Sequence, residues 1–271
     1  MMLKQRIITA LILAPLVVWA ILSLQNATLS MILGVVFTLG AWEWSRLVGI
    51  ECHLGRIGYS AIFPVSFYFY YPLLSEGTWL QFLLTLAAVW WALALLSVVT
   101  FPRSEGLWKS SALARAFAGP FVLIPSWGAL TLLHSSYGPG YFILLMLIIW
   151  GADSGAYFAG RAFGKHKLAP HVSPGKSWEG VIGGLLTAVV IAVIATQWLD
   201  AVSGLTGFIT LVVLTVFISV LGDLTESLFK RVMTIKDSGT ILPGHGGVLD
   251  RIDSLTAAAP IFTLGLLWLS R

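Results

Sequence analysis

The stretch Leu205-Thr-Gly-Phe-Ile-Thr-Leu-Val-Val-Leu-Thr-Val-Phe-Ile-Ser-Val-Leu-Gly222 has no charged side chain along its length. A run of about 18 or more apolar residues is long enough to cross a bilayer as an α-helix. Similar runs occur on both sides of it, and together they predict nine membrane spans. These spans cover residues 7–24, 29–47, 59–74, 79–101, 117–134, 141–159, 181–199, 205–222 and 254–269. The sequence therefore predicts an all-α, polytopic integral membrane protein.

The composition of the whole chain favours the same interpretation. Of its 271 residues, 58% are hydrophobic and 10% are charged, whereas soluble domains are about 45–50% apolar and about 25% charged. The apolar runs also lack the alternation typical of β-barrel strands, and the single cysteine, Cys52, excludes an internal disulfide. We expect one membrane domain, residues 1–271, in which residues 1–135 form scaffold spans and residues 141–271 carry the catalytic spans and cytoplasmic loops.

The basic residues predict the orientation of this domain. Of the 16 Lys and Arg residues, all except Arg271 fall on one side of the membrane, either before the first span or at the end of an even-numbered span and in the loop after it. Because cytoplasmic loops carry an excess of Lys and Arg, we expect the N-terminus and these loops in the cytoplasm, and the protein in the inner (cytoplasmic) membrane. This topology accounts for the net charge of +4, so we expect no nucleic-acid partner. An N-terminal signal peptide is disfavoured because no convincing cleavage site follows the first apolar run.

Acidic residues occur where apolar surroundings make them costly. Asp153 lies inside the sixth predicted span, and an ionisable residue at such a position is a functional hypothesis by default. Asp223 and Glu226 are three residues apart at the end of the eighth span, and Asp250 and Asp253 are three apart just before the ninth. Residues three apart share a helix face, and four carboxylates there would repel one another unless cations lay between them. Oxygen ligands of this kind, together with substrate phosphate, suit Mg²⁺.

Basic, hydroxyl and glycine residues accompany these acids in the cytoplasmic loops. Lys176 lies in Ser173-Pro-Gly-Lys-Ser-Trp-Glu-Gly180, and His245 lies in the turn Pro243-Gly-His-Gly-Gly247. Glycines allow a positive φ and close backbone approach, and successive N–H groups in such a turn can bind an anion. We expect His245 to contact substrate rather than zinc, because no second His or Cys is near it. Residues 160–165 fall one residue short of a phosphate-binding P-loop and follow a span rather than a strand.

Carboxylates for a divalent cation, basic groups for phosphates and a glycine-rich turn are the groups that phosphoryl or nucleotidyl transfer requires. Their place at the cytoplasmic face indicates one water-soluble and one lipid substrate. A transporter remains an alternative because intramembrane acids also suit ion pathways, as does a transferase for a different lipid phosphate. Any single acid could instead form a salt bridge with Lys230, Arg231 or Arg251, and Asp153 could pair with Arg161 on its own helix.

Three segments resemble one enzyme family. The stretch Ser227-Leu-Phe-Lys-Arg-Val-Met-Thr-Ile-Lys-Asp-Ser-Gly-Thr-Ile-Leu-Pro-Gly-His-Gly-Gly-Val-Leu-Asp-Arg-Ile-Asp253 closely resembles the signature of the phosphatidate cytidylyltransferases, or CDP-diacylglycerol synthases. The stretches Asp153-Ser-Gly-Ala-Tyr-Phe-Ala-Gly-Arg161 and Ser173-Pro-Gly-Lys-Ser-Trp-Glu-Gly180 are similar to other polar blocks of that family. The resemblance implies transfer of CMP from CTP to phosphatidate with release of pyrophosphate.

The resemblance also implies Mg²⁺ as a cofactor, K⁺ as a second ion, and a homodimer of nine-span subunits. Carried over by position, it makes Asp223 and Asp250 the leading metal ligands, with Asp253 close by. We expect a catalytic group comprising Asp223, Asp250, Asp253, Lys236 and Asp237. We expect substrate contacts from Ser173, Lys176, Ser177, Lys230, Arg231, His245, Gly246, Arg251, Asp153 and Arg161.

Overall fold

The computed structural model describes residues 2–75, 77–199, 204–241 and 246–270. Within these ranges the secondary structure is helical except for one short hairpin. The elements are α1 (Met2–Ser23), α2 (Asn26–Val48), α3 (His53–Tyr70), η1 (Pro72–Ser75), α4 (Gly77–Val99), α5 (Glu105–Ser110), α6 (Ala112–Ser136), α7 (Pro139–Phe163), β1 (Lys167–Ala169), β2 (Ser173–Ser177), α8 (Trp178–Ala195), α9 (Leu205–Val232) and α10 (Leu249–Leu269).

The all-α polytopic architecture is confirmed. In the described part of the chain, seven helices are long and apolar enough to cross a membrane, namely α2, α4, α6, α7, α8, α9 and α10. The first and third predicted spans overlap α1 and α3, which do not meet that criterion. Helix α3 begins with the polar turn His53-Leu-Gly-Arg56, which lowers its mean hydropathy. The count of nine spans therefore stays a prediction.

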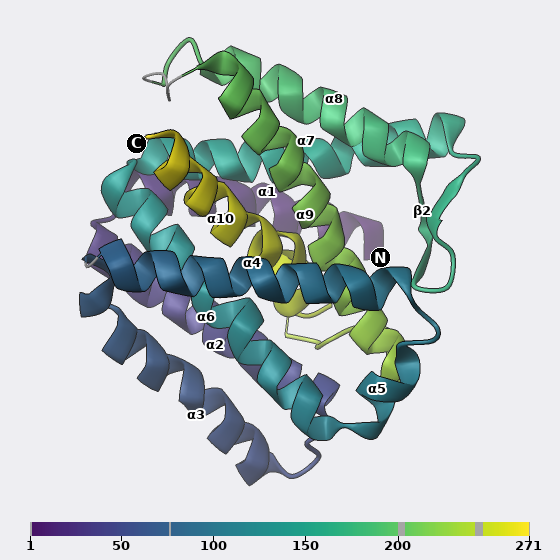
Figure 1. Cartoon of the computed structure of the whole chain (residues 1–271). Helices are drawn as coiled ribbons and strands as arrows, with labels where there is room; N and C mark the ends of the chain where they lie inside the picture. Colours follow the sequence, from purple (N-terminus) through teal and green to yellow (C-terminus); the bar gives the residue numbers. More distant parts are fainter. Residues whose placement is uncertain (1, 76, 200–203, 242–245, 271) are drawn as a thin grey trace.

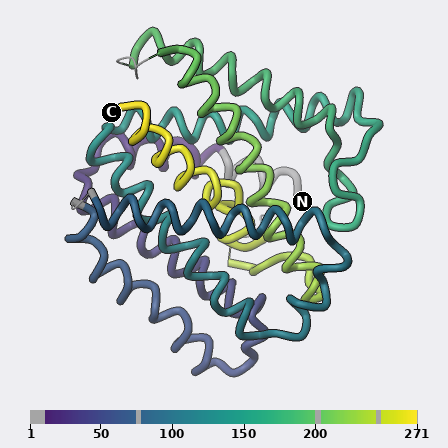
Figure 2. The backbone as a smooth tube through the Cα atoms, in the orientation of Figure 1, coloured from purple at the N-terminus to yellow at the C-terminus, as the bar shows by residue number. Residues whose placement is uncertain are grey.

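Helix α10 lies at the centre of the bundle. It contacts α2, α4, α6, α7 and α9, and Figures 1 and 2 show it between an upper group, α7, α8 and α9, and a lower group, α2, α3 and α6. Its small residues Ala257, Ala258 and Ala259 are fully buried, and small residues let membrane helices approach closely. The last helix of the chain thus contacts helices from both halves of the sequence.

Helices α7 and α8 pack with their backbones in contact. A Cβ atom added at Gly184 of α8 would lie 2.7 Å from the carbonyl oxygen of Ala152 on α7. Only glycine fits at such a distance, and glycine-mediated packing of this kind is typical of membrane helix pairs. The close approach fixes the position of Asp153, which follows Ala152 on α7.

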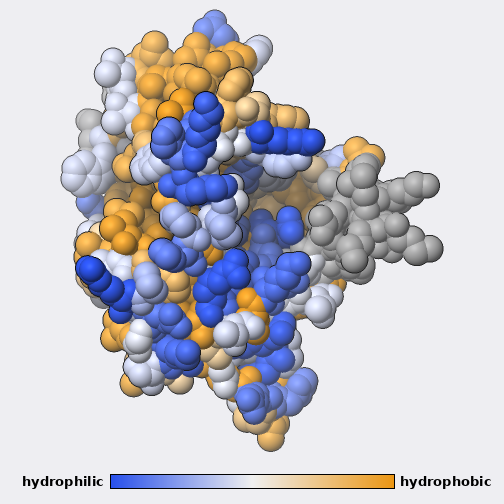
Figure 3. Space-filling view, turned by 90° about the vertical axis from the view of Figure 1, so that its right-hand side faces the viewer, coloured by the Kyte–Doolittle hydropathy of each residue, from blue (hydrophilic) through white to orange (hydrophobic). Residues whose placement is uncertain are grey.

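One end of the bundle is polar. Helix α5 and strand β2 lie at this end, on the right in Figure 1. Figure 3 views the molecule from that side and shows hydrophilic side chains gathered over it, with apolar side chains around them. Elsewhere α2, α4 and α8 expose many large apolar side chains, as expected of a surface that faces lipid. The polar end is where the candidate site must be sought.

Two helices extend further into this polar end than the sequence predicts. The eighth span was expected to end at Gly222, whereas α9 continues to Val232. The ninth was expected to begin at Ser254, whereas α10 begins at Leu249 and has Asp250 in its first turn. An aspartate in the first turn interacts favourably with the positive end of the helix dipole. Asp250, expected just before the ninth span, thus has a helical position in the first turn of α10.

Candidate active site

Four elements bring a cluster of charged side chains together at the polar end of the bundle. Asp153 of α7 interacts electrostatically with Lys176 of β2 and with Asp223 of α9. Asp253 of α10 interacts with Asp223, Lys176 and Lys230, and Glu226 of α9 interacts with Asp253, Lys230 and Asp250. We call these seven residues, five acids and two lysines, the charged cluster. Every member was singled out by the sequence, although they come from segments up to 100 residues apart.

Asp250 is held by four donors. Its Oδ1 accepts a 2.7 Å hydrogen bond from Lys230 Nζ. Its Oδ2 accepts from the backbone N–H of Gly247 at 2.8 Å and from the N–H and Oγ of Ser238 at 3.1 and 2.9 Å. Charge-assisted hydrogen bonds of this kind are among the stronger ones in proteins. The carboxylate of Asp250 therefore has one fixed orientation, set by α9 and by the segment between α9 and α10.

Two lysines form salt bridges with acids of the charged cluster, which was the alternative considered for any single acid. Lys230 Nζ lies 2.7 Å from Asp250 Oδ1 and 3.3 Å from Glu226 Oε1. Lys176 Nζ lies 2.7 Å from Asp223 Oδ2. The pairing thus uses Lys176 rather than Arg231 or Arg251 for Asp223. The charged cluster therefore contains five carboxyl groups and two ammonium groups, which is a formal excess of negative charge.

The chemistry of these donors fits a hard cation. The five acids offer oxygen atoms, the ligands that Mg²⁺ prefers, and the two oxygens of Glu226 are buried without a well-oriented hydrogen bond. Among the described residues, however, no three His, Cys, Asp or Glu side chains are grouped closely enough to hold a metal ion. The side chains of Lys176 and Lys230 instead lie directly against Asp223 and Asp250.

The β1–β2 hairpin positions Lys176. Its strands pair in antiparallel register, with Lys167 opposite Ser177 and Ala169 opposite Ser173. Ser177 Oγ accepts a 3.2 Å hydrogen bond from the N–H of Gly180 and so caps helix α8. Ser177 therefore has a structural partner, and its predicted contact with substrate stays a prediction.

Two arginines have contacts other than those considered from the sequence. Arg231 Nε donates a 3.2 Å hydrogen bond to the carbonyl of Val172 and thereby ties α9 to the hairpin. Arg161 Nη1 donates to the hydroxyl of Tyr157 at 3.3 Å. Asp153 interacts electrostatically with Lys176 and Asp223, and the alternative of an ion pair between Asp153 and Arg161 is not found among the described residues.

The remaining predicted site residues lie near the cluster or outside the described residues. Lys236 and Asp237 are exposed on the segment between α9 and α10, and Arg251 is exposed on the first turn of α10. Gly246 has a φ of 83°, the left-handed conformation that favours glycine. His245 lies outside the residues that the structure describes.

Glu43 is a site neighbour that the sequence interpretation missed. It lies on α2, in the segment expected to be scaffold, and is only 1% exposed. Its Oε2 accepts a 2.7 Å hydrogen bond from the N–H of Leu249, the first residue of α10. The signal that could have identified it is the one used for Asp153, an acid inside a predicted span.

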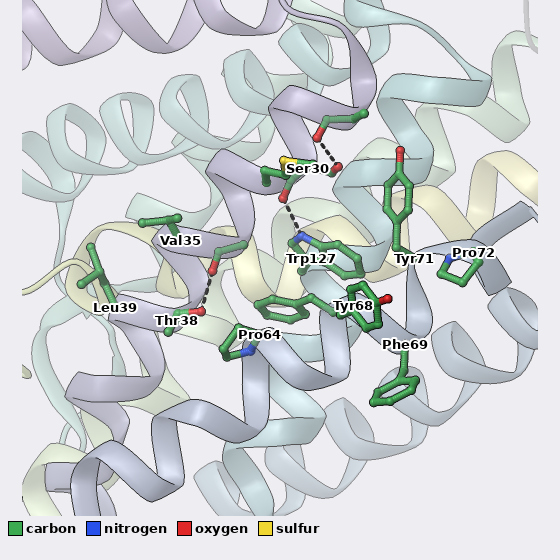
Figure 4. A pocket seen from close by; sticks show the side chains of 14 residues that line it. Ser30, Val35, Thr38, Leu39, Pro64, Tyr68, Phe69, Tyr71, Pro72 and Trp127 are labelled. Carbon is green, nitrogen blue, oxygen red and sulfur yellow. Dashed lines mark hydrogen bonds between the residues drawn. The ribbon is translucent and has the colours of Figure 1, made fainter. Parts of the chain in front are cut away.

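An apolar pocket lies away from the charged cluster. It has a volume of about 740 Å³ and is lined by mainly apolar side chains of α2, α3 and α6 (Figure 4). Its wall hydrogen bonds are internal, as in the 2.9 Å bond from Trp127 Nε1 to the carbonyl of Ser30. The void beside Glu226 and Asp253 measures only about 10 Å³. A substrate would therefore meet the cluster on its open side, where the side chains of Asp223 and Lys176 are 35% and 24% exposed.

Comparisons with known proteins identify the family of the chain. The model of the cytidylyltransferase family matches residues 4–269. A relative from Pseudomonas aeruginosa, named phosphatidate cytidylyltransferase, is 48% identical over 98% of this chain and 97% of its own length. Relatives with the same name from Haemophilus influenzae and Brucella suis are 46% and 34% identical over 97% of this chain, and over 98% and 92% of their own lengths. The chain is a member of the cytidylyltransferase family.

Proposed function

We propose that this protein is a phosphatidate cytidylyltransferase, which transfers CMP from CTP to phosphatidate and gives CDP-diacylglycerol and pyrophosphate. The observation that carries the proposal is the charged cluster, which combines carboxylates and lysines at the polar end of a membrane-spanning bundle. A nucleotide from water and a phosphate on a lipid headgroup can both reach such a position. The full-length similarity to relatives named for this activity supports the same reaction.

In the reaction, an oxygen of the lipid phosphate attacks the α-phosphorus of CTP. A new phosphorus–oxygen bond forms, the bond from the α-phosphorus to the bridging oxygen breaks, and pyrophosphate leaves with the electron pair. Catalysis of this kind consists mainly of positioning and charge neutralisation. Lys176 and Lys230 are suited to bind phosphate oxygens, because each already presents its ammonium group within 2.7 Å of a carboxylate oxygen.

Asp223, Asp250 and Asp253 would hold Mg²⁺, with K⁺ as a second ion. A bound divalent cation neutralises phosphate charge and orients the attacking and leaving oxygens. The two lysines would then exchange their carboxylate partners for phosphate oxygens of the substrates. The excess of three carboxylates over ammonium groups in the charged cluster supports this exchange, because it leaves negative charge that a cation can balance.

We place the site on the cytoplasmic side of the inner membrane, because the loops that carry Lys and Arg lie at that side under the positive-inside rule. Cytoplasmic CTP is then available to it. We also propose that the subunit forms a homodimer, as the family resemblance implies. Residues 1–135 would serve mainly as scaffold, and residues 141–271 would supply the reacting groups.

The direct test uses purified protein in lipid nanodiscs with CTP and phosphatidate, scored for Mg²⁺-dependent pyrophosphate release and for CDP-diacylglycerol. We expect turnover with phosphatidate, none after chelation of Mg²⁺, and none with polyprenyl phosphate. Turnover with polyprenyl phosphate alone would identify a transferase for another lipid. Absence of turnover in folded protein, together with ion flux across vesicles, would favour a transporter and refute the proposal.

The role of Asp250 can be tested by Asp250→Asn, which keeps the shape of the side chain and removes its charge. We expect turnover to be lost while the protein stays folded, because a neutral amide is a poor metal ligand and cannot balance Lys230. Glu105→Gln is the matched control, since Glu105 pairs with Lys109 on the exposed helix α5 at 3.6 Å. Full activity of Asp250→Asn would remove Asp250 from the metal site.

A further inference from the structure

Glu43 is a buried acid from a helix remote in sequence from the reacting groups. It lies on α2, more than 190 residues before Ser238 in the chain, yet its Oε2 accepts a 2.7 Å hydrogen bond from the N–H of Leu249 and lies 3.3 Å from the Oγ of Ser238. Leu249 is the first residue of α10, and the first N–H groups of a helix have no partner within the helix. Glu43 thus supplies, from another helix, an acceptor at the N-terminus of α10.

Ser238 connects Glu43 with the charged cluster. Its Oγ lies within hydrogen-bonding distance of both Glu43 Oε2 and Asp250 Oδ2, at 3.3 and 2.9 Å, and its N–H donates to Asp250 Oδ2 at 3.1 Å. Its carbonyl accepts a 2.8 Å hydrogen bond from Arg46, one turn after Glu43 on α2. Ser238 is fully buried. Glu43 and Arg46, in one turn of α2, therefore contact Ser238, and Ser238 in turn forms hydrogen bonds with Asp250.

The fit around the Glu43 carboxylate leaves no space for a different arrangement. A Cβ atom added at Gly239 would lie 1.9 Å from Glu43 Oε1, and one added at Gly247 would lie 2.4 Å from Oε2. The backbone on both sides of the α9–α10 connection therefore rests against this one side chain. Loss of the carboxylate would leave a void between α2 and this backbone, together with an unpaired N–H at Leu249.

We propose that Glu43 is a positioning residue for the reaction. It fixes Ser238 and the start of α10, and through them the orientation of Asp250. This proposal rests on the proposed function for its kinetic consequences, because it assigns Asp250 to the site that binds Mg²⁺ and CTP. Its structural consequence, order in the described parts of residues 236–250, is independent of that function.

The variants Glu43→Ala and Glu43→Gln separate the hydrogen bonds from the charge. Glutamine retains an oxygen that can replace Oε2, whereas alanine removes both acceptors. We expect Glu43→Ala to lower kcat and raise the Mg²⁺ concentration for half-maximal activity by about 10- to 100-fold, the usual cost of losing a partner that orients a metal ligand. Glu43→Gln should restore most of the loss.

Tyr59→Phe is the control for a general loss of packing. Tyr59 Oη donates a 3.0 Å hydrogen bond to the carbonyl of Ala116, between α3 and α6, so this variant also loses an internal hydrogen bond but leaves the α9–α10 connection intact. It should keep its Mg²⁺ requirement. Ser238→Ala should resemble Glu43→Ala, and the double variant should be little worse than either, because residues in one chain of contacts are not additive.

A readout without substrate completes the test. Amide hydrogen exchange, measured without nucleotide or Mg²⁺, should be about tenfold faster in the described parts of residues 236–250 of Glu43→Ala, and unchanged there in Tyr59→Phe. Unchanged local exchange, a normal Mg²⁺ requirement, or no recovery in Glu43→Gln would each overturn the proposal. If the unaltered protein lacks cytidylyltransferase activity, the proposed function fails, and the exchange experiment still decides whether Glu43 orders this segment.

Discussion

Replacing Lys230 with methionine removes the positive charge shared by two buried acids while keeping a side chain of similar length. Lys230 is 15% exposed, and its partners Glu226 and Asp250 are 3% and 9% exposed. Breaking a buried ion pair by removing one partner costs about 3–5 kcal/mol, because the remaining charge is left uncompensated. We therefore expect Lys230→Met to lower the free energy of unfolding by about that amount.

The assay is thermal or denaturant unfolding of the purified protein in one detergent, without nucleotide. Lys109→Met is the reference variant, because Lys109 and Glu105 are 66% and 38% exposed and lie 3.6 Å apart. An exposed ion pair of this kind contributes about 0–1 kcal/mol to stability. Adding Glu226→Gln to Lys230→Met should recover part of the lost stability. If Lys230→Met were no less stable than Lys109→Met, the reasoning that Lys230 neutralises these acids would be refuted.

Two further substitutions test how the site is supported, both by thermal unfolding. Ser177→Ala removes the cap of α8 and should cost about 1 kcal/mol, whereas Ser177→Gly should cost only a few tenths; equal effects would show that the cap is not what Ser177 contributes. Gly184→Ala places a Cβ atom 2.7 Å from the carbonyl oxygen of Ala152 and should cost about 1–3 kcal/mol by overpacking. Gly175→Ala is its control, because a Cβ atom there meets nothing within 4 Å, and similar stabilities for the two would contradict the close packing of α7 on α8.

The fold class could be predicted from the sequence because it depends on local composition. A long uncharged run such as 205–222 specifies a membrane helix whatever its neighbours are. The ends of helices were harder to predict from the sequence, because the main-chain hydrogen bonds of α9 continue through the polar residues after Gly222. Hydropathy marks where a span leaves the apolar layer, and the helix itself continues to Val232.

The acids and lysines of the charged cluster could be identified individually, because each is a charged residue in or beside an apolar segment. The pairs that these residues form could not be predicted, because Lys176 and Asp223 belong to elements whose contact depends on the packing of α7, α8 and α9. Glu43 was missed for a related reason. Its partners lie about 200 residues later in the chain, and contacts at that separation depend on how α2 packs beside α10.

The central place of α10 has a consequence for biogenesis. It is synthesised after α2, α4, α6, α7 and α9, and it contacts all five of these helices. Until it enters the bilayer, Gly222 of α9 and Ser126 of α6 lack the backbone of α10 that they contact in the finished bundle. Asp250 and Asp253 belong to α10, so a nascent chain in which α10 has not yet been synthesised carries three of the five acids of the charged cluster. The site is thereby assembled only after α10 has joined the other helices.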